Sequence, residues 1–212
     1  EHYTVEKELA ERLRHASREE RRHLYTSVYD ELLQRVRHHP LLHARRTAED
    51  IQRNVETQLG WLAPYFNRDT VFLEIGAGGC HLSLAMAERV AQVIAVDVSP
   101  AMVRLLRQKV GQSGLTNIEC VLGGFLSYEH QGPPADFIVS RHALHHLPDF
   151  WRAVALQRMA DTLRPGGVLR LRDIVYSFSP QEAEGVFSTW LSRAAPSEEH
   201  GWTREELETH IR

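Results

Sequence analysis

Cysteine is scarce in this sequence, with only Cys80 and Cys120 among its 212 residues. The two form neither a C-x-x-C pair nor any other zinc-ligand spacing, so no structural metal is expected. A chain of this length buries enough surface to fold without disulfides, and such sparse thiols fit a reducing cytoplasm. We therefore expect a cytoplasmic protein without covalent cross-links.

Long apolar runs are also missing. No window approaches the roughly 20 uninterrupted apolar residues that a membrane-spanning helix needs. The sequence begins Glu1-His2-Tyr3, without an initiator methionine and without a basic segment followed by an apolar one. Neither a membrane span nor a signal peptide is therefore expected.

A strong charge of either sign is absent as well, because 25 basic residues face 28 acidic ones. Residues 1–60 balance the two signs, residues 61–180 are nearly neutral, and residues 181–212 carry seven acidic and three basic residues. Neutralising a phosphate backbone favours a clear basic excess. A nucleic-acid partner is therefore disfavoured.

Short β-rich runs alternate with helical patterns in the middle of the chain. Strands are predicted at residues 71–75, 93–97, 118–122, 136–140 and 168–175. Helices are predicted between them at residues 82–90, 99–110 and 150–163. This alternation predicts an α/β fold, a Rossmann-like, mostly parallel and doubly wound sheet with helices on both faces.

Helical patterns flank this region on both sides. The apolar spacing predicts helices within residues 4–37, and Thr47 with Glu49 and Asp50 marks the start of another that runs toward Phe66. Residues 180–195 and 203–211 are also predicted to be helical. We expect an N-terminal helical cap (1–66), a cofactor-binding core (67–176) and a helical lid segment (177–212).

The first predicted strand ends in a glycine-rich turn, Gly76-Ala77-Gly78-Gly79. Glycines let the backbone approach a ligand, and the N-terminus of the following helix offers free N–H groups. Asp97 ends the next strand, where an acidic side chain can accept both hydroxyls of a ribose. The pattern favours a nucleotide-containing cofactor.

The turn does not match a dinucleotide fingerprint, because His81 stands where that pattern has a small residue. It opens instead with Glu74, and Glu74-Ile75-Gly76-Ala77-Gly78 resembles the acidic-x-Gly-x-Gly opening of the class I S-adenosylmethionine (SAM) methyltransferases. Three further blocks are similar to that family's ribose-binding strand end, its fourth strand with the following turn, and its turn into the fifth strand: residues 96–102, 135–147 and 163–169. The resemblance covers about residues 70–176 and implies SAM as the cofactor.

Methionine-binding residues follow from this resemblance by position. Gly76 and Gly78 are expected to wrap the methionine part of SAM, and Glu74 to fix its ammonium group directly or through water. Glu74 as a buried acid bonded to the backbone is the alternative. Ser140 is expected beside the methionine moiety, with His146 below it.

The resemblance also implies residues for the nucleoside part of SAM. Asp97 is expected to take the ribose hydroxyls and Val98 to pack on adenine. Gly124 and Phe125 stand where the family often has an acidic residue followed by an apolar one, so the acidic contact to adenine is absent here. Cys80 occupies a place where a third glycine is common, and it is either a packing residue or a reactive thiol.

His142, His145 and His146 form an H-x-x-H-H cluster. A zinc site needs three or four ligands, and without further Cys or acidic ligands nearby we expect no metal here. His145 is a candidate general base, with a place in the pocket wall as the alternative. Aromatic side chains that could reach the cofactor or line an apolar acceptor pocket, or else pack in the core, are Tyr25, Tyr29, Trp61, Trp190 and Trp202.

The predicted function is methyl transfer from SAM to a small-molecule acceptor through an oxygen, nitrogen or carbon nucleophile. A nicotinamide-dependent oxidoreductase and a non-catalytic SAM-binding protein are the alternatives. Class I methyltransferases usually end with two further strands, whereas this sequence stops in a helical pattern at Ile211-Arg212. We therefore expect the C-terminal strands to be missing from this chain, and its oligomeric state stays open.

Overall fold

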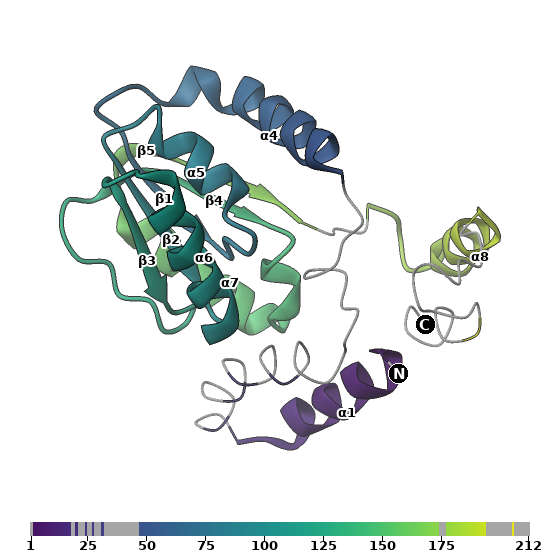
Figure 1. The fold of residues 1–212 in the computed structure, drawn as a ribbon. Helices are drawn as coiled ribbons and strands as arrows, with labels where there is room; N and C mark the ends of the chain where they lie inside the picture. Colours follow the sequence, from purple (N-terminus) through teal and green to yellow (C-terminus); the bar gives the residue numbers. More distant parts are fainter. Residues whose placement is uncertain are drawn as a thin grey trace.

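Five parallel strands form the centre of the molecule in a computed structural model, which describes residues 2–17, 20, 24, 27, 31, 47–173, 177–193 and 205. The strands are β1 (Val71–Ile75), β2 (Gln92–Asp97), β3 (Ile118–Leu122), β4 (Ala135–Arg141) and β5 (Leu163–Arg172). Their order across the sheet is β3-β2-β1-β4-β5 (Figure 1). The predicted Rossmann-like α/β fold is confirmed, and its described sheet is wholly parallel.

Helices connect and flank these strands. They are α1 (His2–His15), α4 (Ala48–Leu62), α5 (His81–Ala87), α6 (Pro100–Ser113), α7 (Asp149–Thr162) and α8 (Ala183–Arg193), with short 3-10 turns η1 (Ala63–Tyr65) and η2 (Leu144–His146). Within the described ranges, no helix is both long and apolar enough to cross a membrane.

Two apolar layers cover the two faces of the sheet. Phe72 and Phe137 pack with Leu62 of α4 and with α5, whereas the next residues along the strands, Leu73 and Ile138, pack with α7. Successive side chains on a strand point to opposite faces, so α4 and α5 cover one face and α7 the other. This burial on both faces explains why the strand segments are apolar throughout.

Helix α4 begins as the sequence predicts. The Thr47 side chain accepts a hydrogen bond from the Asp50 amide, and the Asp50 carboxylate accepts one from the Thr47 amide, which completes a capping box. The helix lies beside α5 over the sheet (Figure 1). It belongs to the predicted cap (1–66), yet it packs directly on the sheet through Leu62.

The fifth strand differs from its prediction. It starts at Leu163 rather than at residue 168, because residues 164–167 lie within the strand as an irregularity. Ala135 pairs with Leu163, but Phe137 pairs with Val168, so the register shifts between these positions. Gly166, with φ +78°, supplies the backbone conformation that this shift needs.

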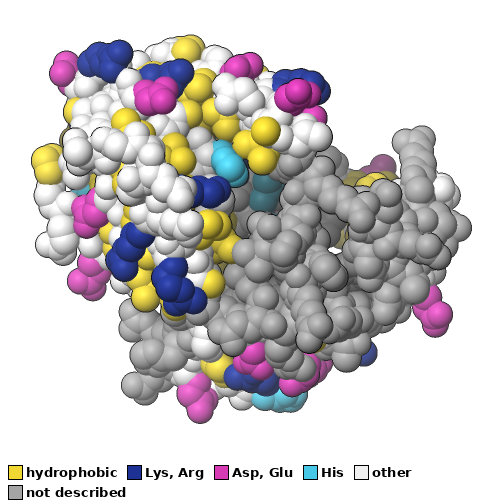
Figure 2. All heavy atoms as spheres, in the orientation of Figure 1, with side chains coloured by type: hydrophobic (Ala, Val, Ile, Leu, Met, Phe, Trp, Pro, Cys, Tyr) yellow, Lys and Arg dark blue, Asp and Glu magenta, His cyan; other side chains and the backbone are white. Residues whose placement is uncertain are grey.

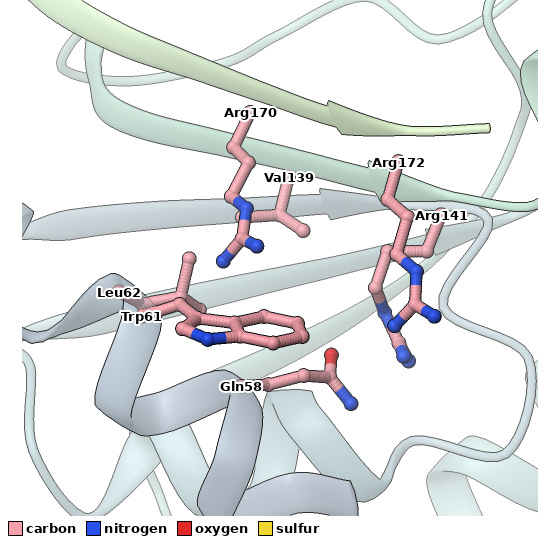
Figure 3. A pocket seen from close by; sticks show the side chains of 7 residues that line it. All are labelled: Gln58, Trp61, Leu62, Val139, Arg141, Arg170 and Arg172. Carbon is pink, nitrogen blue, oxygen red and sulfur yellow. The ribbon is translucent and has the colours of Figure 1, made fainter.

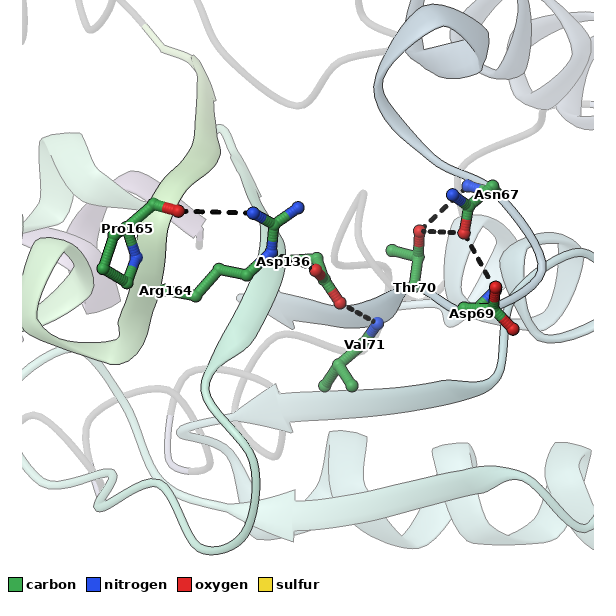
Figure 4. Close-up of polar contacts among 7 residues, drawn as sticks. All are labelled: Asn67, Asp69, Thr70, Val71, Asp136, Arg164 and Pro165. Atoms are coloured by element: carbon green, nitrogen blue, oxygen red, sulfur yellow. Dashed lines mark hydrogen bonds and ion pairs between the residues drawn. The ribbon is translucent and has the colours of Figure 1, made fainter.

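A polar cluster closes the amino end of the sheet. The Asp136 carboxylate accepts a hydrogen bond from the Val71 amide at 2.7 Å and another from the Arg164 guanidinium (Figure 4). Burial raises the pKa of Asp136, but the two hydrogen bonds and the positive charge of Arg164 together outweigh that effect and hold its pKa below the usual value. One carboxylate thus links β1, β4 and β5.

The segments outside the α/β core are described in part. Figure 1 shows α1 and α8 apart from the sheet. No strand follows β5 in the part of the chain that the structure describes. The division into cap (1–66), core (67–176) and lid (177–212) remains a prediction.

Candidate active site

The glycine-rich turn lies at the carboxyl edge of the sheet, where the strand order changes direction. The amides of Gly76 and Ala77 both donate to the Val96 carbonyl, at 2.9 and 3.1 Å. Gly76 has φ +80°, and a β-carbon placed on it would lie 2.7 Å from the β-carbon of Ala143. Gly78 has φ +49° and open space where a β-carbon would be. The turn is therefore held tightly at Gly76 and leaves room at Gly78.

Asp97 lies beside this turn at the end of β2. Its carboxylate accepts hydrogen bonds from the Gly78 amide at 2.8 Å and from the Ser99 amide at 3.0 Å. The side chain is buried, and the Asp97 carbonyl accepts a further bond from the Gly123 amide at 2.9 Å. The backbone of two loops thus fixes the orientation of this carboxylate.

Glu74 is completely enclosed below the turn. Its carboxylate accepts a 2.6 Å hydrogen bond from the Ser83 hydroxyl and lies 3.8 Å from the Arg141 guanidinium. Burial raises the pKa of Glu74 to about 7, although Arg141 and Ser83 both favour the charged form. The Glu74 carboxylate is therefore held within the protein by Ser83 and Arg141.

The loop after β3 lies against the residue that follows Asp97. A β-carbon on Gly124 would lie 3.3 Å from the Val98 side chain, so these two residues are in close contact. Phe125 packs on the core layer that faces α7. Arg158 of α7 donates to the carbonyls of Phe125 and Tyr128, at 3.1 and 2.6 Å, and thereby holds the loop in place.

Ser140 and His146 lie near the end of β4. Ser140 is buried, and its hydroxyl has no hydrogen-bond partner in the described ranges. An unsatisfied buried hydroxyl is uncommon and invites a ligand. Burial lowers the pKa of His146 to about 4, helped by neighbouring His145, so His146 is neutral at neutral pH.

The side chain of His145 is bonded to Asp173, which directly follows β5. Its Nδ1 contacts one carboxylate oxygen of Asp173, and its backbone amide donates to the other at 3.1 Å. The Arg152 guanidinium donates to the His145 carbonyl at 3.0 Å, which also holds this turn in place. The His145 ring lies 4.0 Å from the His146 ring, centroid to centroid.

Sequence reasoning named His145 but missed Asp173. The only signal available was an acidic residue near the end of the predicted fifth strand (168–175), close to the edge where α/β sheets bind ligands. In the described part of the chain, no three His, Cys, Asp or Glu side chains are grouped as metal ligands require.

Cys80 stands where the resemblance expects a glycine. It adopts the left-handed conformation that glycine favours, with φ 65°. It is fully buried, and burial raises the pKa of its thiol to about 12. These surroundings fit the packing alternative, since a reactive thiol needs a lowered pKa and access to solvent.

The predicted aromatic residues have different surroundings. Trp61 borders a pocket between α4 and strands β4 and β5, shown in Figure 3. Trp190 lies on α8 and is half-exposed. Tyr25, Tyr29 and Trp202 lie outside the described residues.

Comparison with known proteins agrees with this geometry. Residues 72–167 match the family described as methyltransferase domain. An uncharacterized methyltransferase of Geobacillus kaustophilus is 33% identical over 106 residues, which cover 50% of this chain and 47% of that protein. A demethylmenaquinone methyltransferase of Listeria welshimeri is 28% identical over 109 residues, covering 50% of this chain and 45% of that protein. The chain thus spans about half the length of the curated relatives it matches.

A solved structure shares the fold. The YcgJ protein of Bacillus subtilis superimposes with a TM-score of 0.55 at 28% sequence identity, covering 65% of this chain and 58% of YcgJ. The matched part corresponds to more than the α/β core alone.

Proposed function

The chain carries a class I SAM-dependent methyltransferase domain, and from this premise we propose that it transfers a methyl group from SAM to a small-molecule acceptor. The nucleophile of the acceptor is an oxygen, nitrogen or carbon atom. One observation carries the proposal furthest: the bonded pair His145 and Asp173 lies at the same edge of the sheet as the glycine turn and Asp97.

Three features of this edge fit SAM. The Asp97 carboxylate is already oriented and suits ribose hydroxyls, and Gly78 leaves side-chain-free space beside it. The unsatisfied hydroxyl of Ser140 suits a polar group of the methionine part. Val98, with Gly124 and Phe125 next to it, offers an apolar surface for adenine.

The role of Glu74 and His146 follows from their burial. Glu74 is enclosed and bonded to Ser83. We therefore propose that it binds the ammonium group of SAM through a water, or helps to position the glycine-rich turn that binds this group. His146 stays neutral and packs against His145, so it does not compete for the proton that His145 takes up.

Bound SAM supplies a methyl group already activated on a sulfonium, so the protein has to align the nucleophile and exclude water. His145 Nδ1 is engaged by Asp173, which assigns its proton to that nitrogen and leaves Nε2 as the acceptor. Nε2 then takes the proton of the acceptor's nucleophile, and the Asp173 carboxylate stabilises the imidazolium that forms.

The charge distribution supports a small acceptor. Among the described residues on the face that Figure 2 shows, basic and acidic side chains are interspersed and form no continuous basic surface. The demethylmenaquinone methyltransferase among the relatives is named for a small molecule. We propose the same class of acceptor for this chain, with a cytoplasmic location as predicted from its cysteines.

Two measurements test this function. Calorimetry with S-adenosylhomocysteine (SAH) and with NADH is expected to show binding of SAH alone, since His81 fills the place of the small fingerprint residue. Transfer of a labelled methyl group from SAM to a metabolite panel then separates an enzyme from a non-catalytic SAM-binding protein. Binding of NADH without SAH would favour the oxidoreductase instead.

A matched pair of variants tests the base. His145→Ala is expected to lower kcat about 100-fold or more with an acceptor that must lose a proton. The control is His15→Ala, because His15 is exposed on α1, where it pairs with Glu11 of the same helix. Equal rates in the two variants would remove His145 from the mechanism.

A further inference from the structure

Two arginines of β5 gather over one tryptophan of α4. The guanidinium carbon of Arg170 lies 4.9 Å from the centroid of the Trp61 ring, and that of Arg172 lies 5.8 Å from it. The two arginines are separated by one residue, so they share a face of the strand. Figure 3 shows both side chains reaching toward the indole from the same side.

These positive charges lack a matching negative charge. Within the described ranges no carboxylate lies within ion-pair distance of Arg170 or Arg172. Arg141, which lines the same pocket, is 3.8 Å from Glu74. The attraction of a cation to an aromatic ring is modest at exposed sites and does not remove the repulsion between neighbouring guanidinium groups. An anion between them would remove it.

Gln58 is an independent sign that a ligand belongs in this pocket. It is only 3% exposed, and its Nε2 donates to the Asn54 carbonyl at 3.2 Å and to the Asn54 side chain. Its Oε1 is buried and has no hydrogen-bond partner among the described residues. In Figure 3 this oxygen points into the space between the Trp61 ring and the guanidinium groups of Arg141 and Arg172. A buried acceptor left unpaired is destabilising, so an N–H or O–H group of a ligand, or of a water bound with it, would stabilise this oxygen.

The pocket adjoins the edge where methyl transfer is proposed. Arg141 and Arg172 are the last residues of β4 and β5, and Asp173 directly follows Arg172. A molecule held here by its anionic end can therefore extend past the strand ends toward His145.

We propose that the methyl acceptor carries a carboxylate, which Arg170 and Arg172 bind over the ring of Trp61. A planar carboxylate matches the fork of donors on a guanidinium group, and a single water beside it can donate to Gln58 Oε1. This inference rests on the proposed methyltransferase function. The other source of a carboxylate at this edge is the methionine part of the cofactor.

Calorimetry on the SAH-loaded chain tests the proposal, with benzoate and its neutral isostere benzamide as probes. Wild type is expected to bind benzoate at least tenfold more tightly than benzamide. Arg170→Gln and Arg172→Gln are each expected to reduce this preference at least fivefold. Arg104→Gln removes the same charge from an exposed site on α6 and is expected to leave the preference unchanged.

The outcomes distinguish a failure of the carboxylate site from a failure of the proposed methyltransferase function. If SAH binds but benzoate is not preferred, or neither probe binds, the carboxylate site is wrong while the methyltransferase function stands. If SAH itself does not bind, the proposed function fails first. If the two β5 variants weaken SAH binding as strongly as benzoate binding, the carboxylate belongs to the cofactor and the acceptor assignment is overturned. Unchanged thermal unfolding of the variants shows that their fold is intact.

Discussion

Ala143 occupies the space that a side chain at Gly76 would need, since a β-carbon there would lie 2.7 Å from the β-carbon of Ala143. Gly76 also has φ +80°, so Gly76→Ala combines a backbone strain with a steric overlap. We expect this variant to lose about 1–3 kcal/mol of unfolding free energy and to bind SAH more weakly. Denaturant unfolding and calorimetry measure the two effects.

Gly111→Ala is the matched control. Gly111 lies within α6, and a β-carbon there meets nothing within 4 Å. Alanine is the better helix former, so this variant is expected to gain about 0.5–1 kcal/mol. Equal destabilisation in both variants would contradict the special role of Gly76.

Asp97→Asn tests the carboxylate that is oriented by Gly78 and Ser99. The amide keeps the size but loses the charge and one of the two acceptor oxygens. SAH affinity is expected to fall by about 1–3 kcal/mol through lost charge-assisted hydrogen bonds. Asp69→Asn, an exposed site at the amino end of the sheet, is the control and should bind SAH like wild type.

Asp173→Asn tests a positioning residue, because Asp173 acts through His145 rather than on the substrate. We expect kcat to fall roughly 10- to 100-fold with little change in KM, since the base loses its orientation and its stabilised charge. A rise in KM as large as the fall in kcat would instead indicate that the acceptor site itself is disturbed.

Glu74→Gln tests the buried carboxyl group through the pH dependence of stability without cofactor. The folded state raises the pKa of Glu74 from 4.5 to about 7, so it holds a proton that the unfolded chain releases. This contribution is fully present below pH 4.5 and is lost as the pH rises through 7. At pH 8 the Gln variant is expected to exceed wild type by about 3 kcal/mol, and at pH 4.5 to equal it.

His146 gives the opposite slope in an overlapping range. Its pKa falls from 6.5 to about 4 on folding, so stability is lost as the pH drops through this interval. In the Glu74→Gln variant, the loss of unfolding free energy that His146 causes at low pH is therefore measured without the opposing contribution of Glu74. Glu119→Gln, at an exposed position on β3, should follow the wild-type curve.

The strands and the cofactor turn could be predicted because their signals are local. Residues 71–75 and 118–122 are strands with the predicted bounds, and Asp97 ends β2 as expected. Each of these signals lies within a few neighbouring residues. The resemblance to methyltransferases rests on the same segments, and residues 72–167 match that family.

Contacts that depend on the pairing of distant strands could not be predicted. Asp173 reaches His145 only because β4 and β5 are adjacent and end level with each other, with Arg141 beside Arg172. Trp61 meets Arg170 only because α4 crosses the face of β5 on which that arginine lies. No local pattern encodes either approach. The site assignments by resemblance remain predictions that the variants above address.

The strand order also has a consequence for how the chain folds. Strands β1, β2 and β3 follow one another within residues 71–122, so each neighbouring pair forms by closing one crossover connection that contains a single helix. Strand β4 pairs with β1, some sixty residues earlier, and the cost of closing a loop grows with its length. We expect the half that contains Asp97 to form first. Strand β4 and the turn with His145 and His146 that follows it then pack against strands that already carry the glycine-rich turn.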